Sequence, residues 1–139
     1  MKQIVIDGSA ALGLILPDER QTDSSKKLRA ALEAKTVARV PAHWWVELTN
    51  GILMAERRKR ITLAVAMELL NLIPALEVST DDETATRTTS DVAALARQKN
   101  LTAYDAAYLE LAIRDGAVLA SQDKELLKAA IECGVEVIR

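Results

Sequence analysis

The sequence predicts an α/β fold of three α/β/α layers, in which helices cover both faces of a five-stranded, mostly parallel sheet. Short apolar segments recur along the chain with helical patterns between them, which is typical of a doubly wound sheet. These segments are nearly continuous apolar runs, as expected for strands buried on both faces. Phe is absent and aromatic residues make up only 3%, so the core must consist of Leu, Ile, Val and Ala.

The expected elements alternate along the whole chain. The strands are predicted at residues 3–7, 37–40, 75–78, 117–120 and 135–138. The helices are predicted at residues 9–16, 23–34, 42–58, 63–73, 82–98, 103–114 and 124–133. Proline or glycine marks the ends of several helices, at Pro17, Pro41, Pro74, Gly116 and Gly134.

Composition indicates one soluble domain that spans residues 1–139. The chain is 50% hydrophobic and shows no linker, so it can bury a core without disulfides. The single cysteine, Cys133, excludes an internal disulfide and fits a reducing, cytoplasmic setting. Asp7 interrupts the apolar start of the chain, and no run approaches the roughly 18 apolar residues of a membrane span.

Four carboxylates are placed where a strand ends or a helix begins: Asp7, Glu47, Asp105 and Asp123. Each has apolar neighbours in the sequence, and a parallel sheet opens its ligand crevice at the carboxyl ends of its strands. Acids set among core-forming residues need partners or a metal ion. If the strands at residues 3–7 and 117–120 are neighbours, the four carboxylates converge at one edge of the sheet.

Each acid also has a purely structural explanation. Asp7 suits the N-cap of the first helix, and Asp123 suits the first turn of the last helix. Asp105 belongs to a capping box that begins at Thr102, while Glu47 fits a solvated helix face. A single shared binding site explains the positions of all four acids better than four unrelated structural roles do.

A shared site of this kind predicts a hard divalent cation. Carboxylates brought together raise one another's pKa values unless a cation holds them, and oxygen donors favour Mg²⁺ or Mn²⁺. Zinc is not indicated, because His43 is the only histidine and suits a helix start. Asn50, one turn beyond Glu47, is placed to orient that carboxylate. The net charge of −2 does not advertise a nucleic-acid binder, but the chain without these four acids is net positive.

Four short motifs resemble those of one family: Ile4-Val5-Ile6-Asp7-Gly8-Ser9, Val46-Glu47-Leu48-Thr49-Asn50, Thr102-Ala103-Tyr104-Asp105-Ala106-Ala107-Tyr108 and Leu119-Ala120-Ser121-Gln122-Asp123. In this order and spacing, the chain is similar to PIN-domain ribonucleases, and most similar to the VapC toxins of bacterial and archaeal toxin–antitoxin pairs. The resemblance covers essentially the whole chain.

The resemblance implies a metal-dependent endoribonuclease with a PIN-like fold. It implies that Asp7, Glu47, Asp105 and Asp123 hold one or two Mg²⁺ or Mn²⁺ ions, with Ser9 and Ser121 in support. A cation there activates water and neutralises the scissile phosphate. Gly8 and Ser121 depart mildly from the family pattern, and neither departure removes a metal ligand.

The resemblance also implies an RNA substrate and protein partners. The basic run Arg57, Arg58, Lys59 and Arg60 is a candidate RNA contact, although a cationic helix end is its simplest explanation. Trp44 and Trp45 suit stacking on bases, but a core or interface role better fits them. The helical hairpin at residues 42–73 offers apolar surface for a cognate antitoxin or for a second copy of the chain, as a homodimer.

Three other functions were considered. A phospho-acceptor receiver domain has a candidate acceptor in Asp81 but lacks paired acids after the first strand and a Lys after the fifth. A haloacid-dehalogenase-type phosphatase requires an Asp where Ser9 stands. A PIN-like module that binds RNA or protein without cutting is the main alternative, and the intact acids argue against it.

Overall fold

The first strand lies at the centre of a parallel five-stranded sheet. The computed structural model describes residues 2–34 and 36–139, and its strand order is β3-β2-β1-β4-β5 with every neighbouring pair parallel. The strands are β1 (Ile4–Ile6), β2 (Ala38–Val40), β3 (Val78–Thr80), β4 (Val118–Ala120) and β5 (Val137–Ile138). Because β1 and β4 are neighbours, the segments that follow them meet at the same edge.

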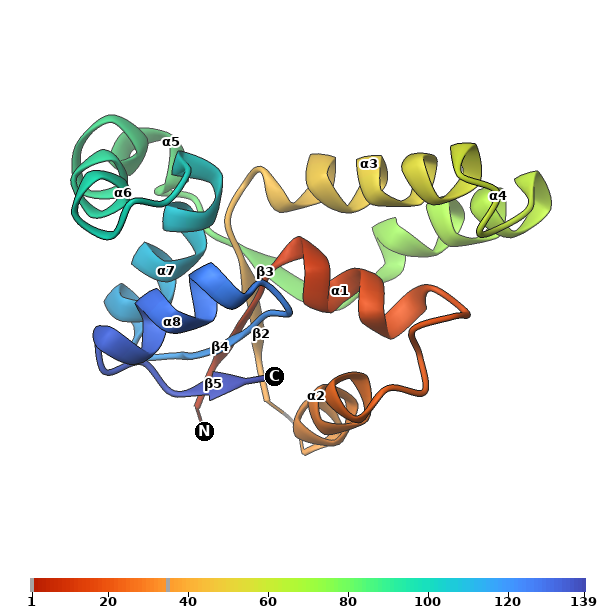
Figure 1. The fold of residues 1–139 in the computed structure, drawn as a ribbon, viewed down its shortest axis with the longest axis horizontal. Helices are drawn as coiled ribbons and strands as arrows, with labels where there is room; N and C mark the ends of the chain where they lie inside the picture. Colours follow the sequence, from red (N-terminus) through yellow and green to blue (C-terminus); the bar gives the residue numbers. More distant parts are fainter. Residues whose placement is uncertain (1, 35) are drawn as a thin grey trace.

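Helices flank this sheet on either side, which confirms the predicted fold class. They are α1 (Gly8–Ile15), α2 (Asp23–Glu33), α3 (Trp44–Arg57), α4 (Leu63–Leu72), α5 (Thr84–Arg87), α6 (Ala93–Lys99), α7 (Ala103–Asp115) and α8 (Lys124–Glu132). In Figure 1, α1 to α4 lie on the right, α5 and α6 at the upper left, and α7 and α8 on the left, with α8 directly above β4 and β5 in this view. No described helix has both the length and the apolar character needed to cross a membrane.

Most predicted helix ends lie within two residues of the observed ones. The exception is the helix predicted at residues 82–98, which is divided into α5, a π-helical turn (Thr88–Val92) and α6. The predicted apolar stripe of α3 is confirmed, since Trp44, Leu48, Ile52 and Ala55 are all buried. Cys133 caps the end of α8 and is half-buried.

The third strand was predicted in the wrong place. The expected strand at residues 75–78 is observed at Val78–Thr80, because Pro74 continues α4 into a 3-10 turn (Ile73–Ala75). The strand is also not the buried apolar run that we expected, since Ser79 and Thr80 are exposed at the edge of the sheet. Backbone pairing with β2 forms this strand, and hydrophobic periodicity does not reveal such pairing.

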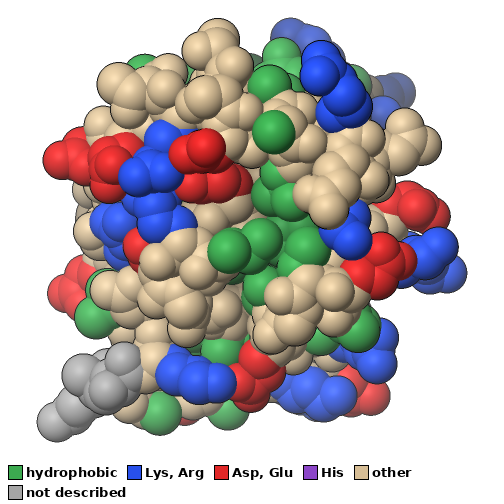
Figure 2. All heavy atoms as spheres, turned by 90° about the vertical axis from the view of Figure 1, so that its left-hand side faces the viewer, with side chains coloured by type: hydrophobic (Ala, Val, Ile, Leu, Met, Phe, Trp, Pro, Cys, Tyr) green, Lys and Arg blue, Asp and Glu red, His purple; other side chains and the backbone are tan. Residues whose placement is uncertain are grey.

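Oppositely charged side chains are neighbours on the side of the molecule formed by α5 to α8, as Figure 2 shows. Arg87 pairs with Glu83 at 3.0 Å and with Asp91 at 2.7 Å, each one helical turn away. Lys99 of α6 pairs with Glu132 of α8 at 3.1 Å. Pairs this exposed contribute about 0–1 kcal/mol each, so they define the surface more than they stabilise the fold.

Helices α1 and α3 approach closely at a glycine. A Cβ atom on Gly51 would lie 2.3 Å from Leu12 Cδ1 and 2.8 Å from Leu12 Cδ2, well inside van der Waals contact. Gly51 therefore lets α3 pack directly on α1, and α3 is the helix that carries Glu47.

We predict that Gly51→Ala destabilises the protein by about 1–2 kcal/mol, because overpacking outweighs the helix propensity gained. In a Leu12→Ala background the clash is absent, so the same substitution should stabilise by up to about 1 kcal/mol. Chemical denaturation of the four variants measures this cycle. Equal effects of Gly51→Ala in both backgrounds would show that the two helices do not constrain each other here.

Candidate active site

Asp7 is a buried carboxylate that ends the central strand. It is 4% exposed and caps α1 by accepting a hydrogen bond from the Ala10 amide at 2.8 Å. Ser9 Oγ donates to Asp7 Oδ1 at 2.7 Å, and Ser121 Oγ donates to Asp7 Oδ2 at 2.5 Å. The capping role expected from the sequence is therefore present, together with two hydroxyl donors that capping does not require.

The same two hydroxyls hold the loop after β4. Ser9 Oγ accepts a hydrogen bond from the Gln122 amide, and Ser121 Oγ accepts one from the Asp123 amide, both at 2.9 Å. Each serine thus joins Asp7 to the loop that carries Asp123. The end of β1 and the loop after β4 form one hydrogen-bonded unit.

Asp105 and Asp123 lie at the starts of two helices and are half-buried. Asp123 caps α8 through a hydrogen bond from the Leu126 amide to its Oδ1 at 2.9 Å. Asp105 is in the first turn of α7, where its own amide donates to the capping Thr102 hydroxyl at 3.2 Å. The structure thus makes Asp123 the cap itself, whereas the sequence suggested a first-turn acid.

Glu47 enters the site from the first turn of α3 and is fixed by residues that the sequence did not single out. Tyr108 Oη donates to Glu47 Oε2 at 2.8 Å, and Tyr108 is fully buried. His43 Nε2 lies 3.5 Å from Glu47 Oε1, and the His43 ring packs against Tyr108 with centroids 4.9 Å apart. A Cβ atom on Gly8 would lie 3.0 Å from Glu47 Oε2, so glycine leaves room for the carboxylate beside α1.

The signal for Tyr108 was available in the sequence. It lies three residues after Asp105 on α7, so the two side chains share one side of the helix. Asn50, by contrast, is exposed, and no described hydrogen bond joins it to Glu47. The expected orienting role of Asn50 is filled by Tyr108 in this structure.

Electrostatic effects connect the four acids. Burial raises the pKa of Asp7 in spite of its three hydrogen bonds, and the charge of Asp105 adds to this. Burial likewise raises the pKa of Asp105, and the charges of Asp123 and Glu47 raise it further. Burial and the neighbouring Glu47 raise the pKa of Tyr108, which keeps its hydroxyl protonated as a donor. Asp105 therefore lies within electrostatic range of each of the other three carboxylates.

The four carboxylates nevertheless do not form a tight cage. In the part of the chain that the structure describes, a group of three acidic, His or Cys ligands with all ligand atoms within 4.8 Å occurs only at Asp81, Asp82 and Glu83. Mg²⁺ commonly binds through one or two carboxylates and retains several waters, so a tight group of three ligands is not a requirement for it.

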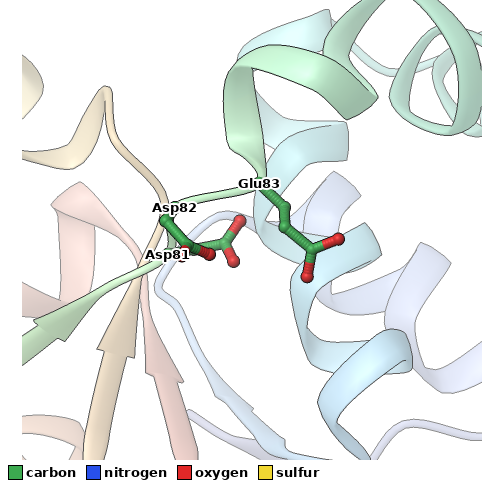
Figure 3. A group of neighbouring side chains, drawn as sticks. All are labelled: Asp81, Asp82 and Glu83. Carbon is green, nitrogen blue, oxygen red and sulfur yellow. The ribbon is translucent and has the colours of Figure 1, made fainter.

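The second acidic group lies just beyond β3, as Figure 3 shows, with Glu83 directed toward α7. Its oxygens already have cationic partners. Arg114 Nη1 and Nη2 donate to the two oxygens of Asp81 at 3.0 and 2.9 Å, and Arg114 Nη1 lies 3.3 Å from Glu83 Oε2. Arg39 of β2 also reaches Asp81, at 3.4 Å. This group can offer three oxygens to a cation, but only in competition with two arginines.

The arginines determine the behaviour of Asp81. Burial alone would raise the pKa of Asp81, but hydrogen bonds from Arg114 and Thr84 and the Arg114 charge outweigh it and hold that pKa below its ordinary value of 3.8. Asp81 is thus a buried structural anion whose two oxygens are already engaged. This disfavours the phospho-acceptor role that we considered for it.

The candidate RNA contacts at the end of α3 are only partly available. Arg60 forms a two-pronged pair with Asp18 at 2.9 Å and also pairs with Glu19 at 2.7 Å. Arg57, Arg58 and Lys59 are exposed. At 1.5 Å per residue, Arg57 lies about 15 Å along α3 from Glu47. Of the two tryptophans, Trp44 is buried in the core, and Trp45 Nε1 donates to Thr80 Oγ1 at 3.0 Å.

Comparison with known proteins gives one consistent family. The model of the PIN domain family matches residues 4–132. Ribonuclease VapC3 of Mycobacterium tuberculosis is 30% identical over 92% of this chain and 88% of its own length. The crystal structure of PAE2754 from Pyrobaculum aerophilum has a TM-score of 0.68 at 22% identity and covers 99% of this chain and 84% of that one. VapBC2 from Rickettsia felis, bound to a DNA fragment from its promoter, has a TM-score of 0.61 at 13% identity over 96% of each chain.

We predict that Arg114→Met destabilises the protein by about 3 kcal/mol at pH 7, because it leaves the buried Asp81 carboxylate poorly compensated. Since the folded pKa of Asp81 is lowered, its ionised form contributes stability above pH 3.8 that is lost as the pH falls through the folded pKa. The difference from wild type should therefore shrink below pH 3.8. Arg60→Met, which removes pairs with the more exposed Asp18 and Glu19, is the control and should cost about 1 kcal/mol or less. Denaturation at several pH values measures both, and equal losses would contradict the role of burial.

We predict that Asp105→Asn stabilises the protein by up to about 1 kcal/mol at pH 7, a few degrees in thermal midpoint. The folded pKa of Asp105 is raised, so its protonated form favours folding at low pH and this contribution is lost as the pH rises through that pKa. The gain should therefore vanish near pH 3.8. Asp82→Asn, the same change at an exposed acid, should lie within about 0.5 kcal/mol of wild type. A destabilised Asp105→Asn protein at pH 7 would mean that the carboxylate has a stabilising partner.

Proposed function

Because the chain belongs to the PIN domain family, we propose that it is a metal-dependent endoribonuclease and the toxin of a toxin–antitoxin pair. The relative that supports this most directly is named a ribonuclease and aligns over 92% of the chain. The proposal therefore concerns hydrolysis of RNA phosphodiester bonds.

One observation carries the proposal for the site. Among the described residues, none of Asp7, Glu47, Asp105 and Asp123 forms an ion pair with Lys or Arg, and His43 is the only basic side chain within reach. The acids at Asp81 and Glu83 show the opposite arrangement, with arginine on each carboxylate. Half-buried, uncompensated carboxylates at the carboxyl edge of a sheet are suited to a cation that arrives from outside the chain.

We assign Mg²⁺ or Mn²⁺ to these four carboxylates. The donor set fits, since it consists of hard oxygen ligands with no cysteine nearby and with histidine only beside Glu47. A divalent cation held there supplies activation of water and neutralisation of phosphate charge.

The protein groups have distinct tasks in this proposal. Ser9 and Ser121 fix both oxygens of Asp7, so that carboxylate cannot rotate away from the edge. Tyr108 donates a hydrogen bond to Oε2 of Glu47, while Oε1 of the same carboxylate lies 3.5 Å from His43 Nε2. The charge of Asp123 raises the pKa of Asp105, so the two acids lie close enough to interact. Together they add to the negative field that attracts the cation. A module that only binds RNA would gain nothing from this unpaired charge.

Partner binding is proposed for the hairpin of α3 and α4. Val46, Leu63 and Met67 are exposed by 72%, 63% and 56%, so the hairpin leaves large apolar side chains uncovered. We propose that a cognate antitoxin, or a second copy of the chain in a homodimer, covers this surface. A cytoplasmic location remains a prediction from the sequence.

We predict that the purified protein cleaves structured RNA with Mg²⁺ or Mn²⁺ and not with EDTA. Asp7→Asn and Asp105→Asn should each lower the rate at least about 100-fold, equivalent to about 2.7 kcal/mol of transition-state stabilisation. The measurement is cleavage followed on denaturing gels. Asp82→Asn, the same change in the arginine-paired group, is the control and should cleave like wild type.

Cleavage that survives both substitutions, or that ignores EDTA, would refute the metal–carboxylate mechanism. Loss of activity in Asp82→Asn but not in Asp105→Asn would move the site to the group beyond β3. In cells, expression of wild type but not of Asp7→Asn should arrest growth.

A further inference from the structure

A surface groove of about 740 Å³ lies along α8. Its lining includes Ser121 and Gln122, which precede Asp123 in the sequence, and Arg139. None of the four carboxylates themselves lines it. Thr22 and Ser24, at the start of α2, line it together with the residues of α8. The groove thus lies between the start of α2 and the last part of the chain, residues 121–139, which are distant in the sequence.

The charge of the groove is positive. Lys124, Lys128 and Arg139 line it, and no described ion pair involves any of the three. Glu132, the one acidic side chain in its lining, is paired with Lys99 at 3.1 Å from outside the groove. The groove therefore offers unneutralised cations in a protein whose net charge is −2.

The groove also has an apolar floor. Leu127 is nearly buried there, and Ile131, one turn further along α8, is 50% exposed. Lys124 and Lys128 are likewise one turn apart, about 6 Å along the axis. Single-stranded nucleic acid has phosphates that bind cations and bases whose ring faces pack on apolar surface. A groove that combines lysines with apolar side chains therefore suits this class of ligand.

Two lining residues of the groove also belong to the hydrogen-bonded unit that holds Asp7. Ser121 donates to Asp7, and the Gln122 amide donates to Ser9, so the groove adjoins the candidate active site. Asp123 stands between Gln122 and Lys124 in the sequence. A strand whose scissile phosphate reaches the four carboxylates would enter this groove with its next nucleotides.

We propose that this groove binds the single-stranded RNA segment adjacent to the scissile phosphate, with Lys124 and Lys128 contacting successive phosphates. This inference rests on the proposed ribonuclease function and adds the path of the substrate. The basic run at the end of α3 is a less direct path, because Arg57 lies about 15 Å from Glu47 along its helix and Arg60 is committed to Asp18 and Glu19.

The test is the salt dependence of RNA binding by the double variant Lys124→Gln, Lys128→Gln. The probe is a fluorescein-labelled 12-nucleotide oligouridine, with fluorescence anisotropy measured in EDTA over about 50 to 300 mM NaCl. Each phosphate contact with a single strand contributes about −0.7 to the slope of log K against log salt. The slope of the variant should be shallower by about 1.4, and its affinity near 0.1 M salt lower by roughly 20-fold.

The matched control is Lys27→Gln, Arg97→Gln, which removes the same charge at exposed positions outside the groove. It should change the slope by less than one contact, about 0.7. Thermal unfolding of both double variants should match wild type, because the substituted side chains are exposed.

A groove variant that keeps the wild-type slope overturns the proposal. So does a variant that loses binding of a labelled 12-residue polyglutamate peptide while binding RNA normally, because the groove would then belong to an acidic protein segment. The binding assay contains no metal and does not depend on cleavage. A shallower salt dependence of RNA binding in the groove variant therefore supports the proposed RNA path even if no cleavage is observed. An unchanged salt dependence overturns the proposed path even if the protein cleaves RNA.

Discussion

The burial of the Asp7 carboxylate is the constraint on which the site depends. A carboxylate that is 4% exposed must satisfy its oxygens locally, and it does so with the Ala10 amide, Ser9 and Ser121. Those hydrogen bonds begin α1, join β1 to the loop after β4 and so set the position of Asp123. One buried charge therefore organises three segments, and the parallel pairing of β1 with β4 brings them together.

The two acidic groups differ in the way that their charge is compensated, and this difference underlies the separate roles that we propose for them. Asp81 is buried beside Arg114 and Arg39, so its pKa is lowered and its charge supports the fold. Asp7 and Asp105 have raised pKa values because no arginine compensates their burial. A protein tolerates such unfavourable charges where function needs them, which is the usual relation between stability and activity. Proximity of oxygen atoms alone points to the group at Asp81, whereas the balance of charge supports the four carboxylates that we propose.

The sequence predicted what depends on local pattern and missed what depends on tertiary pairing. Apolar runs and helix caps located four of the five strands and most helix ends. The third strand was misplaced because an exposed edge strand has no apolar signature, and because Pro74 extends α4 instead of ending it. At the site, the four acids were recognisable from their position after strands or at helix starts. Tyr108 and Arg114 were not singled out, because their partners lie 61 and 33 residues away.

The arrangement of charge at the carboxyl edge suggests how one small domain can attract both a cation and a polyanion. The four carboxylates repel RNA unless a cation neutralises them, so substrate binding depends on cations placed beside the acids and not among them. Helix α8 satisfies this condition, because Asp123 caps it toward the acids while Lys124 and Lys128 face the groove. Lys99, which does not line the groove, forms an ion pair with Glu132, the acidic side chain in the lining. The negative field of the four carboxylates thus meets the positive field of the groove at the first turn of α8. The RNA that is to be cut would cross from one field to the other there.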